Sequence, residues 1–273
     1  MRVASTPETV TPADKVELDA RELALAGVIR EAGRLARTYF YDRASLGLTF
    51  KGPQDYLTVA DGAVERAIIE RLGRAFPGDG FLGEEGGGRP APSLWVIDPI
   101  DGTANFARGV PHFCISIAYM RNGKVELGAI YQPITDELFA ARRGAGAACN
   151  GRKMQVSATK DMAQAIVELG WSKRRPMQTY TAVMERVVTA GGSFRRAGSG
   201  ALGLAYVADG RSDGYAELHI NSWDCLAGLI MIEEAGGWTN DFLAGNGLTE
   251  GNPVLAATPA LAAAMQKATG IER

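Results

Sequence analysis

The sequence predicts an α+β fold in which helices and strands are arranged in layers. The N-terminal part repeats apolar residues at helical spacing, and the segment after residue 78 changes to short apolar runs typical of strands. Asn122-Gly123 stands between two such runs, which is a strong signal for an antiparallel hairpin. Helices and strands thus arrive in blocks around an antiparallel region, a pattern typical of layered α+β proteins.

Two helices are expected before the first strands. Thr11-Pro12-Ala13-Asp14 supplies a hydroxyl cap, a Pro at the first helical position and an acid in the first turn. Apolar residues at helical spacing then extend this helix to Tyr39. A polar loop is expected around residues 51–53. The second helix begins near residues 58–61 and ends at Pro77-Gly78.

The rest of the chain alternates between shorter elements. Strands are predicted at residues 94–97, 113–120, 125–131, 138–141, 166–169, 194–196, 214–220 and 254–257. Helices are predicted at residues 180–190, 200–208 and 223–235 and after Pro259. We expect residues 1–10 to be a flexible leader and residues 11–273 to form one domain, with an internal seam near residue 150.

The composition is that of a folded globular protein and argues against several classes of function. Hydrophobic residues make up 46% of the 273 residues and charged residues 22%, which argues against disorder and coiled coils. The 29 basic and 31 acidic residues give a net charge of −2, so no nucleic-acid or membrane-surface partner is predicted. The first residues lack the apolar core of a signal peptide, and no apolar run approaches the roughly 20 residues of a membrane helix. Three cysteines without Cys-x-x-Cys spacing favour a reducing cytoplasm over a disulfide framework.

The strongest signal of chemistry is WVIDPIDGT at residues 95–103. An apolar strand brings Asp98 and Asp101 to its end. We expect the two acids to converge on one point, because Pro99 prevents the strand from simply continuing. The Gly-Thr pair that follows offers backbone N–H groups to an anion. Carboxylates beside amide donors predict a hard cation such as Mg²⁺ next to a phosphate. The alternative is an Asx-turn, in which each Asp only accepts hydrogen bonds from backbone amides.

Two further segments carry acids at the ends of predicted elements. Gly83-Glu84-Glu85-Gly86 follows an apolar pair, and Asp224 follows Trp223 at the start of an apolar helix. Taken singly, such acids are typical of a solvated turn or of a helix N-terminus, where the helix dipole favours a negative charge. Together with residues 95–103, they supply the carboxylates that a site for more than one Mg²⁺ needs.

These segments resemble the inositol monophosphatase family of Mg²⁺-dependent, lithium-sensitive phosphatases. The resemblance rests on GEE, WVIDPIDGTANF and SWDCLAGLIMIEEAGG, in this order, and extends from about Leu18 to the C-terminal helix. The DPIDGT core with a downstream Trp-Asp is highly specific. The resemblance implies a layered αβαβα sandwich, a homodimer and two to three Mg²⁺ ions per site.

The resemblance also implies roles for individual residues. Glu84, Asp98 and the backbone carbonyl of Ile100 would hold one Mg²⁺. Asp98 would bridge to a second ion that Asp101 and Asp224 also hold, and a third, weaker ion would lie near Glu84.

Other residues would act on the water and the substrate. Asp61 would pair with the hydroxyl of Thr103, and together with Glu84 it would orient and deprotonate the attacking water. The backbone N–H groups of Gly102 and Thr103 would bind the phosphate. The residues implied for contacts with substrate hydroxyls are Asp101, Gly198, Ser199 and Glu217.

The predicted activity is Mg²⁺-dependent hydrolysis of a small phosphorylated polyol or sugar by a metal-activated water. Inositol-1-phosphate is the first candidate, because the segment TANFARGVPHFCISIA after DPIDG is more similar to the inositol branch than to the histidinol branch. Histidinol phosphate and fructose-1,6-bisphosphate are the alternatives for the same site. The basic cluster Lys173-Arg174-Arg175 indicates no particular substrate class.

Two other hypotheses use these residues differently. An aspartyl-phosphate phosphatase would use an Asp as nucleophile, but such enzymes typically carry Asp-x-Asp, whereas here the acids stand three apart. Glu84 would also have no role in that mechanism. A non-catalytic scaffold that binds a macromolecular partner predicts damaged metal ligands, whereas all four implied side-chain ligands are present.

Overall fold

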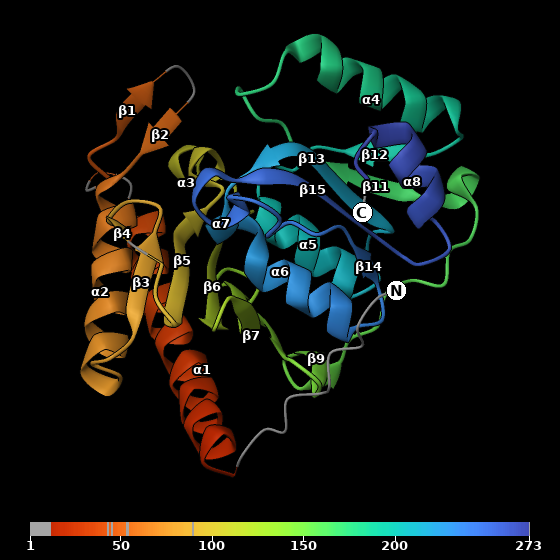
Figure 1. Ribbon diagram of the computed structural model, residues 1–273. Coiled ribbons are helices and arrows are strands. Elements are labelled where there is room, and N and C mark those ends of the chain that lie inside the picture. The colour runs from red at the N-terminus through yellow and green to blue at the C-terminus, as the bar shows by residue number, and fades with distance from the viewer. Residues whose placement is uncertain (1–11, 43, 45, 53–54, 89, 273) are drawn as a thin grey trace.

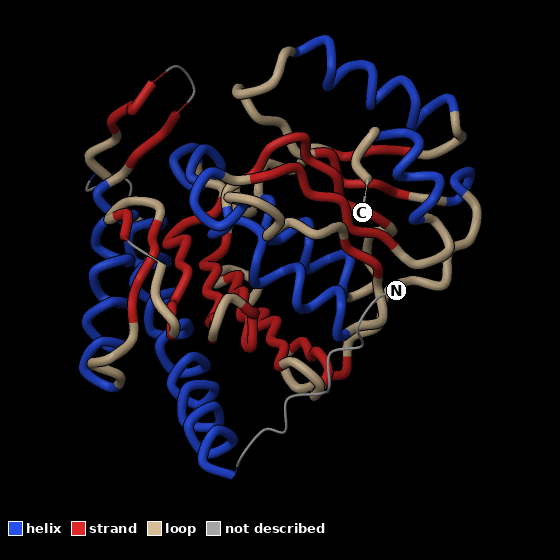
Figure 2. The backbone as a smooth tube through the Cα atoms, in the orientation of Figure 1, coloured by secondary structure: helices blue, strands red, loops and turns tan. Residues whose placement is uncertain are grey.

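Five layers of alternating helices and sheets make up the protein, whose computed structural model describes residues 12–42, 44, 46–52, 55–88 and 90–272 (Figures 1 and 2). The helices are α1 (Pro12–Tyr41), α2 (Val59–Ala75), α3 (Thr103–Arg108), α4 (Met177–Thr189), α5 (Gly200–Ala208), α6 (Ser222–Glu234), α7 (Gly247–Glu250) and α8 (Ala262–Thr269), with a 3₁₀ turn, η2, at Met162–Gln164. The predicted leader at residues 1–10 lies outside the described residues.

The larger sheet has eight strands in the order β10-β9-β8-β7-β6-β5-β3-β4. Its neighbouring strands are antiparallel except β3 and β5, which are parallel. The strands are β3 (Gly80–Gly83), β4 (Gly87–Gly88), β5 (Ser93–Asp101), β6 (Cys114–Arg121), β7 (Lys124–Gln132), β8 (Glu137–Arg142), β9 (Gly146–Cys149) and β10 (Arg152–Lys153).

The smaller sheet has five strands in the order β12-β11-β13-β15-β14. The first three strands of that order are parallel, and the last two pairs are antiparallel. The strands are β11 (Ile166–Leu169), β12 (Ser193–Arg195), β13 (Gly214–Ile220), β14 (Trp238–Thr239) and β15 (Asn252–Ala257).

Helices fill the space between the sheets and cover both outer faces. On one side of the larger sheet, α1 and α2 pack against β5, β6 and β7, and on its other side α5 and α6 separate it from the smaller sheet. Helices α4 and α8 pack against each other and against β12 and β15 on the far face of the smaller sheet. Three clusters of buried apolar side chains fill the spaces between the layers, and the largest of them extends across the α5 and α6 layer to both sheets. This arrangement confirms the predicted α+β layered sandwich.

Most predicted elements agree with the structure, but the sequence analysis did not predict α3, α7, β9 or β14. One prediction is wrong, and it lies near residue 51. The predicted polar loop is instead a pair of short antiparallel strands, β1 (Thr49–Gly52) and β2 (Asp55–Leu57). Residue 53, which the prediction also included, lies outside the described residues. Within the described part of the chain, no helix combines the length and apolarity needed to cross a bilayer.

A buried ion pair joins α1 to the start of the larger sheet. Both guanidinium nitrogens Nε and Nη2 of Arg21 donate to the carboxylate of Asp79, at 2.9 and 2.7 Å. The indole N–H of Trp95 donates to the same carboxylate at 2.9 Å. The side chains of Arg21 and Asp79 are only 13% and 3% exposed, so this network lies largely out of water.

Replacing Asp79 with Ala should lower the free energy of unfolding by about 3 kcal/mol, because it leaves the Arg21 guanidinium and the Trp95 N–H without their acceptor. Urea denaturation measures this loss. The matched control is Glu31→Ala, which removes an ion pair with Arg71 whose side chains are about half exposed and should cost less than about 1 kcal/mol. If the two variants lost the same free energy of unfolding, burial would not be the reason that the Asp79 ion pair matters.

Candidate active site

The carboxylates of Asp98 and Asp101 share one side of β5 because the strand is irregular between them. Asp98 pairs with Ser116 of β6 and Asp101 with Cys114, so three steps along β5 match two along β6. This is a β-bulge, and it reorients side chains that would otherwise point to opposite faces. β5 runs to Asp101, and its pairing is irregular across Pro99, which agrees with the expectation that this residue prevents the strand from simply continuing. Pro lacks an N–H and is tolerated at a bulge, where pairing is already interrupted.

Asp101 joins the strand to the other half of the molecule. Its carboxylate accepts hydrogen bonds from the Ser199 hydroxyl and from the backbone N–H groups of Gly200 and Ala201, at 3.2 and 2.8 Å. These groups begin α5, so the negative charge of Asp101 lies at the positive end of that helix. The thiol of Cys114 lies 3.7 Å from the same carboxylate. Asp101 therefore accepts hydrogen bonds from backbone amides, as the Asx-turn alternative predicted for each Asp.

Asp224 is fixed at the first turn of α6 by a capping box. Its Oδ2 accepts the backbone N–H of Asn221 at 3.0 Å and the Asn221 side-chain amide at 3.3 Å. Such a box satisfies donors at the helix start and orients the carboxylate. The loop between β13 and α6 thereby holds Asp224 at the edge where β5 ends.

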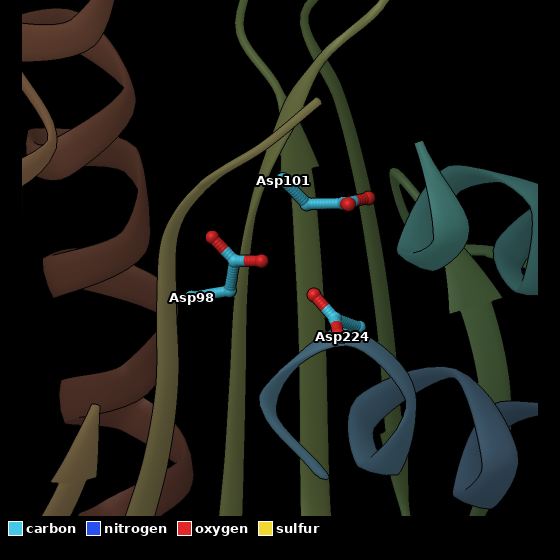
Figure 3. Close-up of side chains that lie close together, drawn as sticks. All are labelled: Asp98, Asp101 and Asp224. Atoms are coloured by element: carbon cyan, nitrogen blue, oxygen red, sulfur yellow. The ribbon is translucent and has the colours of Figure 1, made fainter. Parts of the chain in front are cut away.

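Oxygen atoms of Asp98, Asp101 and Asp224 lie within 4.8 Å of one another (Figure 3). Asp98 and Asp101 are only 1% and 7% exposed. Burial raises the pKa of Asp98 well above its ordinary value, and the charges of Glu84, Asp101 and Asp224 raise it further. Burial, followed by the charge of Asp101, raises the pKa of Asp224 to about 7. Ionising these carboxyl groups therefore costs free energy unless a cation lies close to them.

Glu84 follows β3 and lines the same cavity as Asp101 and Asp224. Its backbone N–H donates to the carbonyl of Ile97 at 3.2 Å, which places it beside β5. It is not one of the three acids whose oxygens lie within 4.8 Å of one another. Its charge nevertheless raises the pKa of Asp98. The four acids that the sequence predicts as metal ligands therefore lie near one another at one end of the cavity.

The turn that carries Glu84 is held by Glu65 of α2, a residue that the sequence analysis did not single out. The buried Glu65 carboxylate accepts the backbone N–H groups of Glu85 and Gly86 at 2.9 and 2.6 Å. A Cβ on Gly86 would lie 2.5 Å from Oε1 of Glu65, so any larger residue there would displace the Glu65 carboxylate. Glu65 stands one helical turn after Asp61, and that i, i+4 spacing is the signal that could have identified it.

The predicted pair between Asp61 and Thr103 is present in the structure. The Thr103 hydroxyl lies 3.3 Å from Oδ1 of Asp61 and also donates to the carbonyl of Ile100 at 3.0 Å. Oδ2 of Asp61 accepts the backbone N–H and the hydroxyl of Thr58 in the capping box of α2. Burial is the main cause that raises the pKa of Asp61, which is fully buried. The Ile100 carbonyl thus contacts the Thr103 hydroxyl.

Gly102 allows the chain to turn sharply from β5 into α3. Its φ of 95° lies in the left-handed region, and an added Cβ would lie 3.1 and 3.2 Å from the carbonyl oxygens of His112 and Gly198. Asn105 of α3 braces this contact, because its side-chain amide donates to the carbonyls of His112 and Ala197 at 2.8 and 2.9 Å. The start of α3 and the segment before α5 are therefore held together.

Ser199 and Glu217 border the cavity from the second half of the chain. Ser199 caps α5, and Glu217 lies on β13, where the Tyr215 hydroxyl donates to its carboxylate at 2.7 Å. Burial raises the pKa of Glu217 to about 8 despite this hydrogen bond. The cavity has a volume of about 620 Å³ and is bordered by Glu84, Asp101, Gly198, Ser199, Glu217 and Asp224.

The donor set at the acidic end of this cavity fits a hard divalent cation. Carboxylate oxygens are the ligands that Mg²⁺ prefers, and the cation would offset the repulsion that raises the pKa of Asp98 and Asp224. The opening beside these carboxylates is large enough for a small phosphorylated molecule.

Comparison with known proteins agrees with this geometry. The profile of the inositol monophosphatase family matches residues 18–271. An inositol-1-monophosphatase of Rhizobium meliloti is 39% identical over 242 residues, covering 87% of this chain and 91% of that protein. A protein of Pasteurella multocida named Nus factor SuhB is 41% identical over 234 residues, covering 84% and 88% of the two chains.

A solved structure is similar over nearly the whole chain. The extragenic suppressor protein suhB from Bartonella henselae superposes with a TM-score of 0.86 at 35% identity, and the match covers 92% of this chain and 98% of that one. The family profile, the relatives and the shared architecture agree, and the chain belongs to the inositol monophosphatase family.

Proposed function

We propose that this protein hydrolyses a small phosphate monoester, inositol-1-phosphate first, to the free alcohol and phosphate with Mg²⁺ as cofactor. The observation that carries the proposal is the convergence of Asp98, Asp101 and Asp224 beside an open cavity. Membership of a family of phosphatases supports the reaction class. The name of the Rhizobium relative, inositol-1-monophosphatase, supports the substrate.

Five residues would hold the metal ions. Glu84, Asp98 and the carbonyl of Ile100 are the proposed ligands of one ion, and Asp98, Asp101 and Asp224 those of a second. A third, weaker ion would be held near Glu84. When bound, Mg²⁺ would neutralise phosphate charge and lower the pKa of a coordinated water, which suits a dianionic ester whose uncatalysed hydrolysis is very slow.

The protein's own groups would orient the attacking water. Asp61 and Thr103 form a polar pair whose buried carboxylate can receive a proton through the hydroxyl. Glu84 is the second proposed acceptor. The water oxygen would bond to phosphorus as the ester P–O bond breaks. The attacking water would give its proton to the carboxylate, and the leaving alkoxide would take up a proton from solvent water. The raised pKa of Asp61 suits a group that accepts a proton during the reaction.

Substrate contacts are proposed from both halves of the chain. The N–H groups of Gly102 and Thr103 would bind the phosphate, since they lie where the chain turns into α3. Glu217 and Asp101 would accept hydrogen bonds from substrate hydroxyls. Gly198 and Ser199 border the same cavity and complete the set.

The two other hypotheses receive less support. A nucleophilic Asp would leave Glu84 and the Asp61–Thr103 pair without a role. A purely non-catalytic scaffold does not explain why Asp98, Asp101 and Asp224 converge at a buried site. A partner-binding role alongside catalysis is a second candidate, which the name Nus factor of the Pasteurella relative favours.

Inhibition by lithium and a homodimer are proposed on family membership alone. A cytoplasmic location is proposed from the cysteine pattern, and a single phosphatase domain over residues 11–273 from the organisation of the sequence. Histidinol phosphate and fructose-1,6-bisphosphate remain the alternative substrates of the same site.

Phosphate release from a panel of esters tests the proposal. The panel contains inositol-1-phosphate, histidinol phosphate, fructose-1,6-bisphosphate and phosphoadenosine phosphate, each with Mg²⁺, with Mg²⁺ and lithium, and with chelator. We expect turnover that requires Mg²⁺ and is fastest with inositol-1-phosphate. Turnover that persists in chelator would contradict the metal site. A single turnover in oxygen-18 water should label the released phosphate, and label in a protein carboxylate would support the nucleophilic Asp instead.

Replacing Asp98 with Asn should lower turnover by more than about 100-fold, because the proposed bridging ligand loses its charge. The fold should survive, since removing one of several mutually repelling carboxylates relieves strain in the metal-free protein. Thermal unfolding checks this: Mg²⁺ should raise the Tm of the wild type but have little effect on the variant. Retained activity with normal Mg²⁺ dependence would contradict the assignment of Asp98.

Replacing Thr103 with Ala should lower kcat by about 100-fold, because Asp61 loses the hydroxyl through which it would reach the water. Thr103→Ser is the matched control and should keep most of the activity, since it keeps the hydroxyl. Steady-state kinetics measure both variants. Equal loss in the two would assign Thr103 a packing role only.

Without metal, the protein should lose stability as pH rises from about 6 to 8. The pKa of Glu217 is raised to about 8 and that of Asp224 to about 7, so the folded state retains protons that the unfolded chain releases. A group with a raised folded-state pKa favours folding below its unfolded pKa, and this advantage falls as pH approaches the folded value. Urea denaturation in chelator should show this fall, and Mg²⁺ should reduce it. Stability that rises with pH in chelator would contradict this electrostatic account.

A further inference from the structure

Tyr215 is a buried residue of the cavity wall that has no role in the proposed reaction. Along β13, every second residue from Tyr215 borders the main cavity, namely Tyr215, Glu217 and His219. Ala216 and Leu218, which lie between them, pack with the apolar cluster on the other face of the sheet. Tyr215 is only 3% exposed. Because β13 pairs with β11 on one side and β15 on the other, its side chains are held on a central strand.

The Tyr215 hydroxyl binds one of the two oxygens of the Glu217 carboxylate. It donates to Oε2 at 2.7 Å. Among the residues that the structure describes, no second hydrogen bond to this carboxylate is formed, so Oε1 is left for a ligand. A hydrogen bond from a fixed donor to one oxygen restricts the rotation of a carboxylate and thereby sets the direction of its other oxygen. Glu217 is the residue proposed above to accept a hydrogen bond from a substrate hydroxyl.

Two glycines leave the space in which Tyr215 and Glu217 meet. Gly170, directly after β11, faces both groups: an added Cβ would overlap with Oε2 of Glu217 and lie 2.5 Å from the Tyr215 hydroxyl oxygen. Gly203, in α5, faces the ring, and a Cβ there would lie 2.8 Å from Cδ2 of Tyr215. A side chain at either position would displace the pair. The backbone of two other segments therefore encloses it.

Packing explains the ring of Tyr215 but not its hydroxyl. The ring belongs to the apolar cluster between the two sheets, and a Phe ring would fill the same space. The hydroxyl adds a polar group to a buried position, which costs free energy unless the group has a partner. Its partner is a carboxylate of the cavity wall. The role of the hydroxyl can therefore be separated from that of the ring.

The surrounding charges keep the Tyr215 hydroxyl a donor. Burial, followed by the charge of Glu217, raises the pKa of Tyr215 well above its ordinary value, so the phenol keeps its proton. Burial also raises the pKa of Glu217 to about 8, and the charges of Asp224 and Asp101 act in the same direction. The hydrogen bond from Tyr215 is the largest effect that opposes this increase, and the charge of Arg196 adds to it. Without the hydroxyl, Glu217 would be a weaker acceptor as well as a more mobile one.

We propose that Tyr215 is a positioning residue for the alcohol portion of the substrate: its hydroxyl holds Oε2 of Glu217, so that Oε1 accepts a hydrogen bond from a substrate hydroxyl. This inference rests on the proposed phosphatase function and deepens it, because it assigns the recognition of a hydroxylated alcohol to two residues of one strand. Tyr215 acts through Glu217 and takes no part in the transfer of the phosphoryl group.

Replacing Tyr215 with Phe tests this role with inositol-1-phosphate and Mg²⁺. KM should rise by about fivefold or more, the worth of one hydrogen bond, while kcat changes by less than about twofold. Inhibition by inorganic phosphate, which has no alcohol portion, should keep its Ki within about twofold, because the proposed phosphate contacts do not include Glu217. A general disturbance of the site would raise the KM and the Ki together.

Two further variants separate positioning from stability. Tyr131→Phe is the matched control, because the Tyr131 hydroxyl also donates to a carboxylate, that of Asp136, at 2.7 Å, but lies on β7 outside the residues that border the cavity. It should cost a similar loss in Tm and keep the wild-type KM and phosphate Ki. When Tyr215→Phe is added to Glu217→Ala, KM should rise by less than about twofold further, because Tyr215 acts through Glu217.

The failure of the positioning role and the failure of the proposed function give different results. Mg²⁺-dependent hydrolysis of inositol-1-phosphate by the wild type, with an unchanged KM in Tyr215→Phe, would overturn the positioning role alone. A rise in KM that Tyr131→Phe shares, that the phosphate Ki follows, or that is as large in the Glu217→Ala background would overturn it too. If the wild type does not hydrolyse inositol-1-phosphate in a Mg²⁺-dependent manner, the proposed function falls, and the positioning role with it.

Discussion

Buried negative charges that repel one another govern the arrangement of this protein's cavity. Asp98, Asp101 and Asp224 bring oxygens within 4.8 Å of one another, and burial together with their mutual repulsion raises the pKa of Asp98. Such a cluster is stable only where the fold supplies hydrogen bonds, protons or cations to offset the charge. Much of the structure around the cavity supplies hydrogen bonds of this kind.

Each acid is held in position by hydrogen bonds that it accepts from backbone N–H groups. Asp98 accepts the N–H of Ile100 within the bulge, Asp224 closes the capping box of α6, and Asp61 closes that of α2. Asp101 reaches across to cap α5, so it ties the strand of one half to a helix of the other. Because these bonds are made by backbone groups that need partners in any case, the acids are oriented at little extra cost.

The sequence predicts the parts of this arrangement that are local. The bounds of α5 and β13 were predictable, because periodicity and caps lie within short segments. The order of the layers and the pair between Asp61 and Thr103, which are 42 residues apart, were instead implied by the family resemblance. The bulge at Pro99 was not, since it depends on pairing with β6. The contacts of Glu65 with the Glu84 turn, and of Arg174 with Asn221, join residues far apart in sequence. Hydrophobic periodicity along the sequence gives no signal for contacts between residues that are far apart.

We propose that a divalent cation, when it binds, replaces protons at the buried carboxylates. Calorimetric titration of Mg²⁺ into the metal-free protein at pH 6.5, in buffers of different ionisation enthalpy, measures protons released on binding. We expect net proton release, because the pKa of Asp224 is raised to about 7 and that of Asp98 well above its ordinary value. Binding without proton release, or no binding of Mg²⁺, would contradict it.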